Sequence, residues 1–192
     1  MEPARIEFNQ TNSASLYAAF NKAYGMECVY HHEILRELTV NEKVSRVAEC
    51  GVFQGWSTAL FMTCEIESLC SYEIDFQHIA PLFLTFMQVK GGIDWSLAAH
   101  NSVSEPINPA DLVFLDTVHT YEFVKQEIAL QAPRASKFVA VHDANYPIDN
   151  THKKVRDAVV EYAEKSNGIW RVVLDSKHDT GFIVIERQTF FG

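Results

Sequence analysis

The sequence predicts an α/β domain with seven strands, in which helices cover both faces of a mostly parallel sheet. Strand-like and helix-like segments alternate along most of the chain, which is typical of parallel strands joined by helices. The hydrophobic period changes from strand to helix across two glycines between residues 44 and 60. Two final strand-like runs, 170–174 and 181–185, have no helix between them, so one strand is expected to be antiparallel.

Length and composition indicate one globular domain over residues 1–192, because 47% of the residues are hydrophobic and 21% are charged. The formal net charge of −9, without a basic cluster, argues against nucleic acid or an anionic membrane as a partner. The four cysteines form no C-x-x-C pair and are expected to be small buried residues in a reducing compartment. The N-terminus lacks the basic and then apolar segments of a secretory signal peptide. No apolar run approaches the roughly 18 residues of a membrane span, so a cytoplasmic protein is expected.

The first 40 residues lack strand alternation and are expected to be helical. Residues 13–24 and 29–38 suit two helices, and the first carries apolar residues at helical spacing that must be buried somewhere. We therefore expect this segment to form a lid over the site or a homodimer contact. His31 and His32 lie in the second helix, and surface or packing roles are favoured for them over roles as ligands.

Residues 44–60 predict a strand, a tight turn and a helix start in succession. Gly51 tolerates a positive φ and permits close approach of a ligand to the backbone, and Gly55 precedes the helix. The helix start adds free N–H groups and a partial positive charge. Phe53 replaces the second glycine of the dinucleotide fingerprint G-x-G-x-x-G, which disfavours close approach of a pyrophosphate. An ordinary capped strand–turn–helix gives the same local pattern.

The following segments extend the alternation of strands and helices. A second strand over 68–74 leads to Asp75, and a helix is expected over 79–90 with Pro81 in its first turn. The core of the domain is expected to run from residue 44 to about residue 188. Its remaining elements are strands over 95–99, 111–115 and 138–141, a helix between Thr120 and Pro133, and an amphipathic helix over 155–163.

Polar side chains follow five of the predicted strands at their carboxyl ends. Ligands of open α/β sheets bind there, so a ligand crevice is expected. Asp75, twenty residues after Gly55, is expected to accept hydrogen bonds from ribose hydroxyls, because a carboxylate offers only acceptors. Glu73 takes this role if the strand ends earlier, and a solvated surface acid is the alternative for either residue. The five polar residues are Glu49, Asp75, Ser102, Asp116 and Asp143.

The string E-x-G-x-x-x-G-x-S-T, from Glu49 to Thr58, resembles the first motif of class I S-adenosylmethionine (SAM) methyltransferases. The nearest variant is the small-molecule O-methyltransferase branch that includes macrocin-type, methyltransferase family 24-like and cephalosporin-hydroxylase-like proteins. The resemblance covers residues 44–188 and implies a Rossmann-like domain that binds SAM. Ser102 matches a serine that the family places beside adenine, and Asn101 stands where the family has an acid. The implied SAM-binding residues are Glu49, Gly51, Phe53, Gly55, Ser57, Asp75, Asn101, Ser102 and Asp116.

The segment FLDTVHTYEFV, residues 114–124, has the D-x-x-H-x-Y pattern of the same branch. The resemblance implies that Asp116 binds a divalent ion and that His119 is the base beside the substrate hydroxyl. A histidine suits this role because its unperturbed pKa of about 6.5 lies near neutral pH.

The segment VAVHDAN, residues 139–145, is similar to the end of the family's fifth strand and implies His142 and Asp143 as further metal ligands. Mg²⁺ is the expected ion because carboxylates offer the oxygen ligands that it requires, and Asn145 can add another oxygen. With His142 present, Mn²⁺, Fe²⁺ or no ion stays open, and His142 as a packed residue is the alternative. Two converging carboxylates repel unless a proton or a cation lies between them, and few lysines or arginines are near in sequence.

The resemblance implies a SAM-dependent methyltransferase that methylates a hydroxyl of a small-molecule acceptor with the help of a metal ion. Two alternatives share the fold. One is a hydroxylase-like enzyme, and the other is a catalytically silent SAM-binding protein. Fold alone does not separate these functions.

Overall fold

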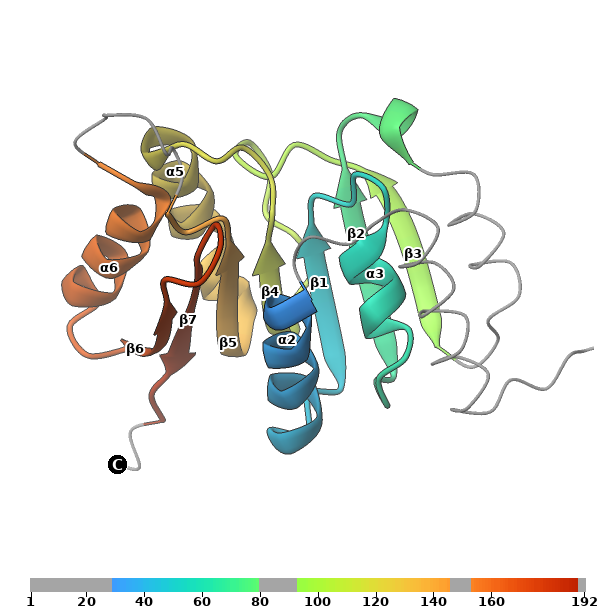
Figure 1. Ribbon diagram of the computed structural model, residues 1–192, viewed down its shortest axis with the longest axis horizontal. Helices are drawn as coiled ribbons and strands as arrows, with labels where there is room; N and C mark the ends of the chain where they lie inside the picture. Colours follow the sequence, from blue (N-terminus) through green and yellow to red (C-terminus); the bar gives the residue numbers. More distant parts are fainter. Residues whose placement is uncertain (1–28, 80–92, 146–152, 190–192) are drawn as a thin grey trace, which may run out of the picture.

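A computed structural model describes residues 29–79, 93–145 and 153–189 of the chain (Figure 1). The expected helix over 13–24 and nearly all of the expected helix over 79–90 lie outside these residues. Within them, strands and helices follow one another in the predicted order. The helix expected over 29–38, which carries His31 and His32, is present. No helix in this described part of the chain is long and apolar enough to span a membrane.

Seven strands form one sheet. They are β1 Arg46–Cys50, β2 Ser68–Glu73, β3 Asp94–Ala99, β4 Ala110–Leu115, β5 Ala135–His142, β6 Trp170–Ser176 and β7 Phe182–Arg187. Their order is β3-β2-β1-β4-β5-β7-β6. Strands β1 to β5 are parallel, and β7 is antiparallel to both of its neighbours, β5 and β6. The prediction of a mostly parallel seven-stranded sheet with one antiparallel strand is therefore confirmed.

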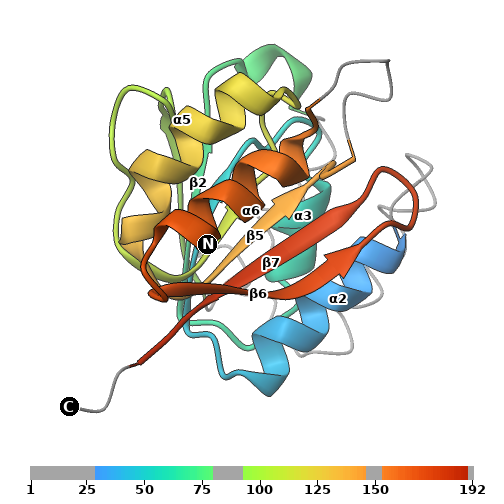
Figure 2. The ribbon, with the colours of Figure 1, turned by 90° about the vertical axis from the view of Figure 1, so that its left-hand side faces the viewer.

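Helices cover both faces of this sheet (Figure 2). They are α2 Val29–Asn41, α3 Trp56–Phe61, α5 Tyr121–Gln131 and α6 Val155–Lys165, together with the short 3-10 helices η1 Phe76–His78 and η2 Ala132–Arg134. Helices α2 and α3 pack on one face, and α5 and α6 pack on the other. The sheet is therefore the middle layer of three.

Strand β4 contributes to the core on both faces. All six of its residues are buried, as expected for a central parallel strand. Because side chains alternate along a strand, Leu112 and Phe114 pack on the face of α2 and α3, whereas Val113 and Leu115 pack on the face of α5 and α6. This double burial holds the end of β4, and the Asp116 that follows it, at the centre of the sheet.

Local signals set the boundaries of α5 and α6. Thr120 caps α5 by accepting a hydrogen bond from the backbone N–H of Phe123 at 3.4 Å, and Pro133 follows the last turn within η2. Both features confirm the helix that the sequence predicts. The predicted apolar stripe of α6 is buried at Val155, Ala158, Val159 and Ala163.

Two strand boundaries differ from the sequence prediction, and both differences affect the site. β1 begins at Arg46, two residues later than expected, and continues through Glu49, which therefore lies within the sheet. β2 ends at Glu73, so this residue is the acid at the strand end and Asp75 lies beyond it.

Candidate functional site

A cavity of about 770 Å³ opens at the carboxyl ends of the strands, where the strand order reverses between β1 and β4. Ligands of open α/β sheets bind at such a switch point, and pockets for small molecules have volumes of about 300–1,000 Å³. The walls are the glycine turn after β1, the end of β2, the loops after β3 and β4, the end of β5, and His32 of α2.

The structure brings most of the predicted site residues to this cavity. Glu49 and Gly55 are the exceptions, since Glu49 is buried behind the turn and Gly55 is the N-cap of α3, with φ of 91°. The predicted residues that line it are Gly51, Phe53, Ser57, Asp75, Asn101, Ser102, Asp116, His119, His142 and Asp143.

Gly51 is required by the packing of the turn itself. Its φ is 89°, and a Cβ at this position would lie 2.0 Å from the carbonyl oxygen of Asp116. No side chain fits at that distance and that φ. The sequence analysis explained this glycine by the close approach of a ligand. The contact with the loop after β4 is a second reason why only glycine fits here.

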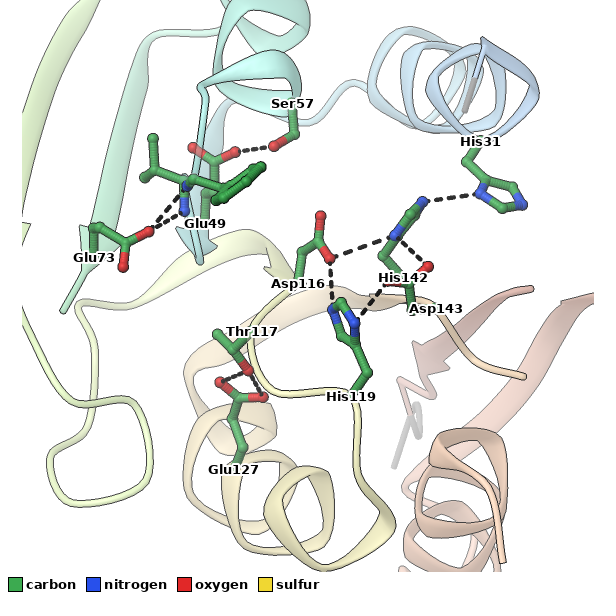
Figure 3. A network of polar contacts seen from close by, with 12 residues as sticks. His31, Glu49, Ser57, Glu73, Asp116, Thr117, His119, Glu127, His142 and Asp143 are labelled. Atoms are coloured by element: carbon green, nitrogen blue, oxygen red, sulfur yellow. Dashed lines mark hydrogen bonds and ion pairs between the residues drawn. The ribbon is translucent and has the colours of Figure 1, made fainter. Parts of the chain in front are cut away.

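Glu49 is fully buried and links three elements from behind the turn (Figure 3). Its carboxylate accepts hydrogen bonds from Ser57 Oγ at 2.5 Å, Thr58 Oγ1 at 2.6 Å and Ser71 Oγ at 2.8 Å. Burial raises the pKa of Glu49 to about 7, although these hydroxyl donors act to lower it. The acid of the motif thus joins β1, α3 and β2, and it is not among the residues that line the cavity.

Glu73 ends β2 beside the glycine turn (Figure 3). One carboxylate oxygen accepts from the backbone N–H groups of Val52 and Phe53 at 2.9 and 3.0 Å, and the other accepts from Ile74 and Asp75 at 2.8 and 2.9 Å. Burial acts to raise the pKa of Glu73, but these four donors outweigh it and lower the pKa. Glu73 is therefore the acid at the turn, while Asp75 is an exposed residue of the cavity rim. We call one part of the site the glycine half. It consists of the Gly51–Phe53 turn together with the two acids Glu49 and Glu73.

The loop after β3 carries the two residues expected beside adenine. Asn101 is exposed, and its side-chain oxygen accepts from the backbone N–H of Val103 at 3.2 Å. Ser102 is buried, and its carbonyl oxygen accepts from Gln131 Nε2 of α5 at 2.5 Å. Both line the cavity, and α5 holds the loop in place.

Glu127 is a buried acid of α5 that the sequence analysis did not single out. It accepts hydrogen bonds from Ser102 Oγ at 2.5 Å and from Thr117 Oγ1 at 2.9 and 3.0 Å, the latter drawn in Figure 3. Burial raises its pKa to about 7. Glu127 therefore links the loop after β3 with the loop after β4. Its place on the buried stripe of α5, between Val124 and Ile128, is the signal in the sequence that can reveal it.

Acids and histidines gather where β4 and β5 end (Figure 3). Asp116, His142 and Asp143 each offer one ligand atom, and these atoms all lie within 4.8 Å of one another. They converge because β4 and β5 are paired neighbours in the sheet. The expected convergence of the two aspartates is therefore confirmed. These three residues and His119 are called the histidine cluster.

His119 lies between the two carboxylates. Its Nε2 is 3.2 Å from Asp116 Oδ1, and its Nδ1 is 2.8 Å from Asp143 Oδ2. Burial acts to lower the pKa of His119, but hydrogen bonds to the two carboxylates raise it to about 9. In this arrangement His119 is a cation at neutral pH. His119 thus supplies positive charge between the two aspartates. From the sequence, only lysines, arginines and metal ions were considered as sources of that charge.

Helix α2 brings two further histidines to the cluster. His31 is fully buried, with Nδ1 2.9 Å from His142 Nε2 and with Nε2 3.1 Å from the carbonyl oxygen of His178. His32 is buried in the cavity wall, and burial lowers its pKa to about 4. Both histidines are packed, as the sequence analysis favoured. The contact between His31 and His142 was missed because it joins residues 111 positions apart.

The donor set of the histidine cluster fits a divalent cation. Asp116 and Asp143 offer carboxylate oxygens, and His142 offers an imidazole nitrogen. Asn145, the further ligand considered from the sequence, contacts the β6–β7 connection instead, with Nδ2 3.4 Å from the Lys177 carbonyl oxygen. A cation here would compete with His119 for these carboxylates.

No model of a known protein family matches the sequence, and no curated protein matches it. Solved structures do match. A candidate caffeoyl-CoA O-methyltransferase from Staphylococcus aureus has a TM-score of 0.63 at 15% identity, over 91% of both chains. A Podospora anserina methyltransferase bound to S-adenosylhomocysteine (SAH) has a TM-score of 0.60 at 14% identity, over 98% of this chain and 91% of its own.

An O-methyltransferase from Bacillus cereus in complex with SAH also matches, with a TM-score of 0.58 at 13% identity, over 95% of this chain and 93% of its own. At such low identity the likeness concerns the course of the backbone. These neighbours therefore establish the fold: the chain has the Rossmann-like fold of class I methyltransferases.

Proposed function

We propose that this protein is a SAM-dependent O-methyltransferase that methylates a hydroxyl of a small molecule with the help of a divalent cation. The observation that carries the proposal is that the glycine half and the histidine cluster face one cavity and meet where Gly51 contacts Asp116. A methyl donor held by the first and an acceptor held by the second would share that cavity. The fold shared with SAH-bound methyltransferases supports the same function.

The proposed donor site consists of the Gly51–Phe53 backbone, Glu73, and the loop that carries Asn101 and Ser102. SAM, when bound, supplies a methyl group on a positively charged sulfur. The Glu73 carboxylate lies at the turn, where ribose hydroxyls would share its oxygens with four backbone N–H donors, and Asp75 at the rim is the second candidate. The chain contributes mainly positioning and the exclusion of water from the reacting groups.

The proposed acceptor site is the histidine cluster. Asp116, His142 and Asp143 would hold the cation, which supplies the charge that lowers the pKa of an acceptor hydroxyl. His119 is the proposed base for the proton of that hydroxyl. It can act only as neutral imidazole, whereas its two carboxylate partners hold it protonated. The role of base therefore requires that His119 lose at least one of these carboxylate contacts.

Residues 1–40 are further proposed to form a lid or a homodimer contact. The support comes from α2, which packs on the core through Leu35 and places His32 on the cavity wall. Light scattering on the purified chain tests the dimer, and a monomer with an accessible N-terminal segment in the presence of SAH would contradict both versions.

Calorimetry with SAM and SAH, followed by methyl transfer from labelled SAM to a panel of catechols and sugars, tests the proposed enzyme. Both compounds should bind, and at least one acceptor should be methylated. Glu73→Gln should weaken SAH binding by about 10–100-fold, because a hydrogen bond to a charged group contributes about 1.5–3 kcal/mol. The matched control is Asp94→Asn, at the exposed amino end of β3, which should bind SAH like the wild type.

Three other outcomes would change the proposed function. Binding of NAD with no binding of SAM or SAH would overturn it. Binding of SAH without methyl transfer to any acceptor would favour a catalytically silent SAM-binding protein. Hydroxylation of an acceptor in place of methylation would favour the hydroxylase-like alternative.

A further inference from the structure

We propose that His31 orients His142 as a nitrogen ligand, and that the histidine cluster consequently prefers a transition-metal ion such as Fe²⁺, Co²⁺ or Zn²⁺ to Mg²⁺. The inference rests on the cation site of the proposed function and adds a positioning residue and a class of metal to it. It departs from the Mg²⁺ that the sequence analysis expects. Three groups carry it, and they are called the histidine relay: the His178 carbonyl, the His31 ring and the His142 ring.

The carbonyl at one end of the histidine relay sets the direction of both hydrogen bonds. The His178 carbonyl oxygen can only accept, so His31 Nε2, at 3.1 Å, carries the hydrogen. The other nitrogen of a neutral imidazole is an acceptor, so His31 Nδ1 accepts a hydrogen bond from His142 Nε2 at 2.9 Å. The hydrogen of neutral His142 is therefore on Nε2, and its lone pair is on Nδ1.

His142 Nδ1 is the atom that faces the carboxylates. It lies 3.1 Å from Asp143 Oδ1 and 3.4 Å from Asp116 Oδ1. A lone pair and two anionic oxygens at these distances repel one another unless a second proton on His142 or a metal ion lies among them. The tautomer that His31 selects thus turns the three atoms into a donor set of one nitrogen and two oxygens.

An imidazole nitrogen in the donor set decides the class of metal. Imidazole suits Fe²⁺, Co²⁺ and Zn²⁺, whereas Mg²⁺ prefers carboxylate oxygens and water. A histidine that binds a metal typically donates its other N–H to a second group, and loss of that group costs about 10–100-fold in metal affinity. His31 is this second group for His142.

Packing holds the His31 ring in the orientation that the relay requires. Figure 3 shows its contact with His142. The ring is fully buried, stacks on Phe182 of β7 with centroids 5.3 Å apart, and meets the His142 ring edge-on at 81°. The relay joins α2, the end of β5 and the β6–β7 connection. It therefore forms only when these three distant segments are folded together, and it belongs to the core.

Calorimetric titration of the metal-stripped full-length protein with Zn²⁺, Co²⁺ and Mg²⁺ tests the preference. Zn²⁺ and Co²⁺ should bind more tightly than Mg²⁺. The proton spectrum of the Co²⁺ form should contain a strongly shifted resonance from His142 Nε2–H that is present in H2O and absent in D2O. His142→Asp should lose this resonance and move the preference toward Mg²⁺. Any Co²⁺ binding that is unchanged in this variant comes from another site on the chain.

Variants of His31 separate positioning from a general role in folding. His31→Phe should lower Co²⁺ affinity by about 10–100-fold. His31→Gln should restore most of it, because the amide oxygen can accept from His142 Nε2 while the amide N–H donates to the carbonyl of residue 178. The matched control, Glu37→Gln, changes an exposed side chain of the same helix and should bind Co²⁺ like the wild type. Thermal unfolding of each variant establishes that it is folded.

Equal affinities for Mg²⁺ and Co²⁺, or wild-type Co²⁺ affinity in His31→Phe, would refute the inference. So would a metal-stripped protein that binds no ion and has hydrogens on both nitrogens of His142, since the ring would then supply the positive charge itself. SAH binding on the same samples distinguishes this result from failure of the proposed function. SAH binding without nitrogen-bound metal refutes the metal preference alone, whereas nitrogen-bound metal without SAH binding refutes the methyltransferase.

Discussion

The two halves of the site stabilise their acidic side chains in different ways. In the glycine half, hydroxyl groups surround Glu49 and backbone N–H groups surround Glu73. In the histidine cluster, imidazole rings contact Asp116 and Asp143. Hydroxyl and amide donors stay in place across the pH range, whereas an imidazole can lose a carboxylate to a metal ion. On the proposed function, the glycine half would be a preformed binding surface and the histidine cluster would respond to cations.

The largest expected effect comes from breaking the histidine cluster. Asp116→Ala removes a proposed metal ligand and a partner of His119, so methyl transfer and its dependence on metal should both be abolished. SAH binding should persist, because Glu73 and its backbone donors are unchanged. Turnover of labelled SAM with and without metal, alongside calorimetry with SAH, measures both. Undiminished turnover of the wild type in EDTA would show that the ion is not required.

Removal of the proposed base should have the next largest effect. His119→Ala should lower kcat by about 10²–10⁴-fold, which is the usual contribution of a general base. Metal affinity should not fall, since His119 competes with the ion for the two carboxylates. Steady-state kinetics with saturating acceptor, together with metal titration, checks both statements, and Glu37→Gln on the exposed side of α2 is the control. Full activity of the His119 variant would exclude it as the base.

A change at Gly51 tests the contact between the two halves. Gly51→Ala should lower the free energy of unfolding by about 1–3 kcal/mol through its positive φ alone. The close approach to the Asp116 carbonyl oxygen, 2.0 Å from the added Cβ, should increase this loss. Gly168→Ala, with φ of 84° beyond the end of α6, is the control for strain without that contact. Equal losses in chemical denaturation would show that the contact is unimportant.

The smallest expected effect concerns the pH dependence of the glycine half. Burial raises the pKa of Glu49 from 4.5 to about 7, so between these values the folded chain keeps a proton that the unfolded chain releases. Stability should therefore fall as pH rises from about 4.5 to about 7. Glu49→Gln should flatten this part of a plot of Tm against pH, and the exposed Glu164→Gln should not. Parallel curves for Glu49→Gln and the wild type would assign the slope to other groups.

Local patterns in the sequence determined the type and order of the elements. The apolar run of β4, the Thr120 cap and the stripe of α6 depend on residues a few positions apart, and all three are present as predicted. The polar residues at the strand ends also follow from local pattern, because parallel strands bring their carboxyl ends to one edge. The position of the cavity was therefore predictable before any contact was known.

Only the tertiary structure decided which partner each polar side chain meets. The strand ends observed in β1 and β2 put Glu49 behind the turn and Glu73 beside it. His31 meets His142 across 111 positions, and this contact depends on how α2 packs against β5 and β7. Such packing leaves no pattern in neighbouring residues. The sequence identified most of the acids and histidines of the site. Their charge and tautomer depend on their partners, and the fold determines those partners.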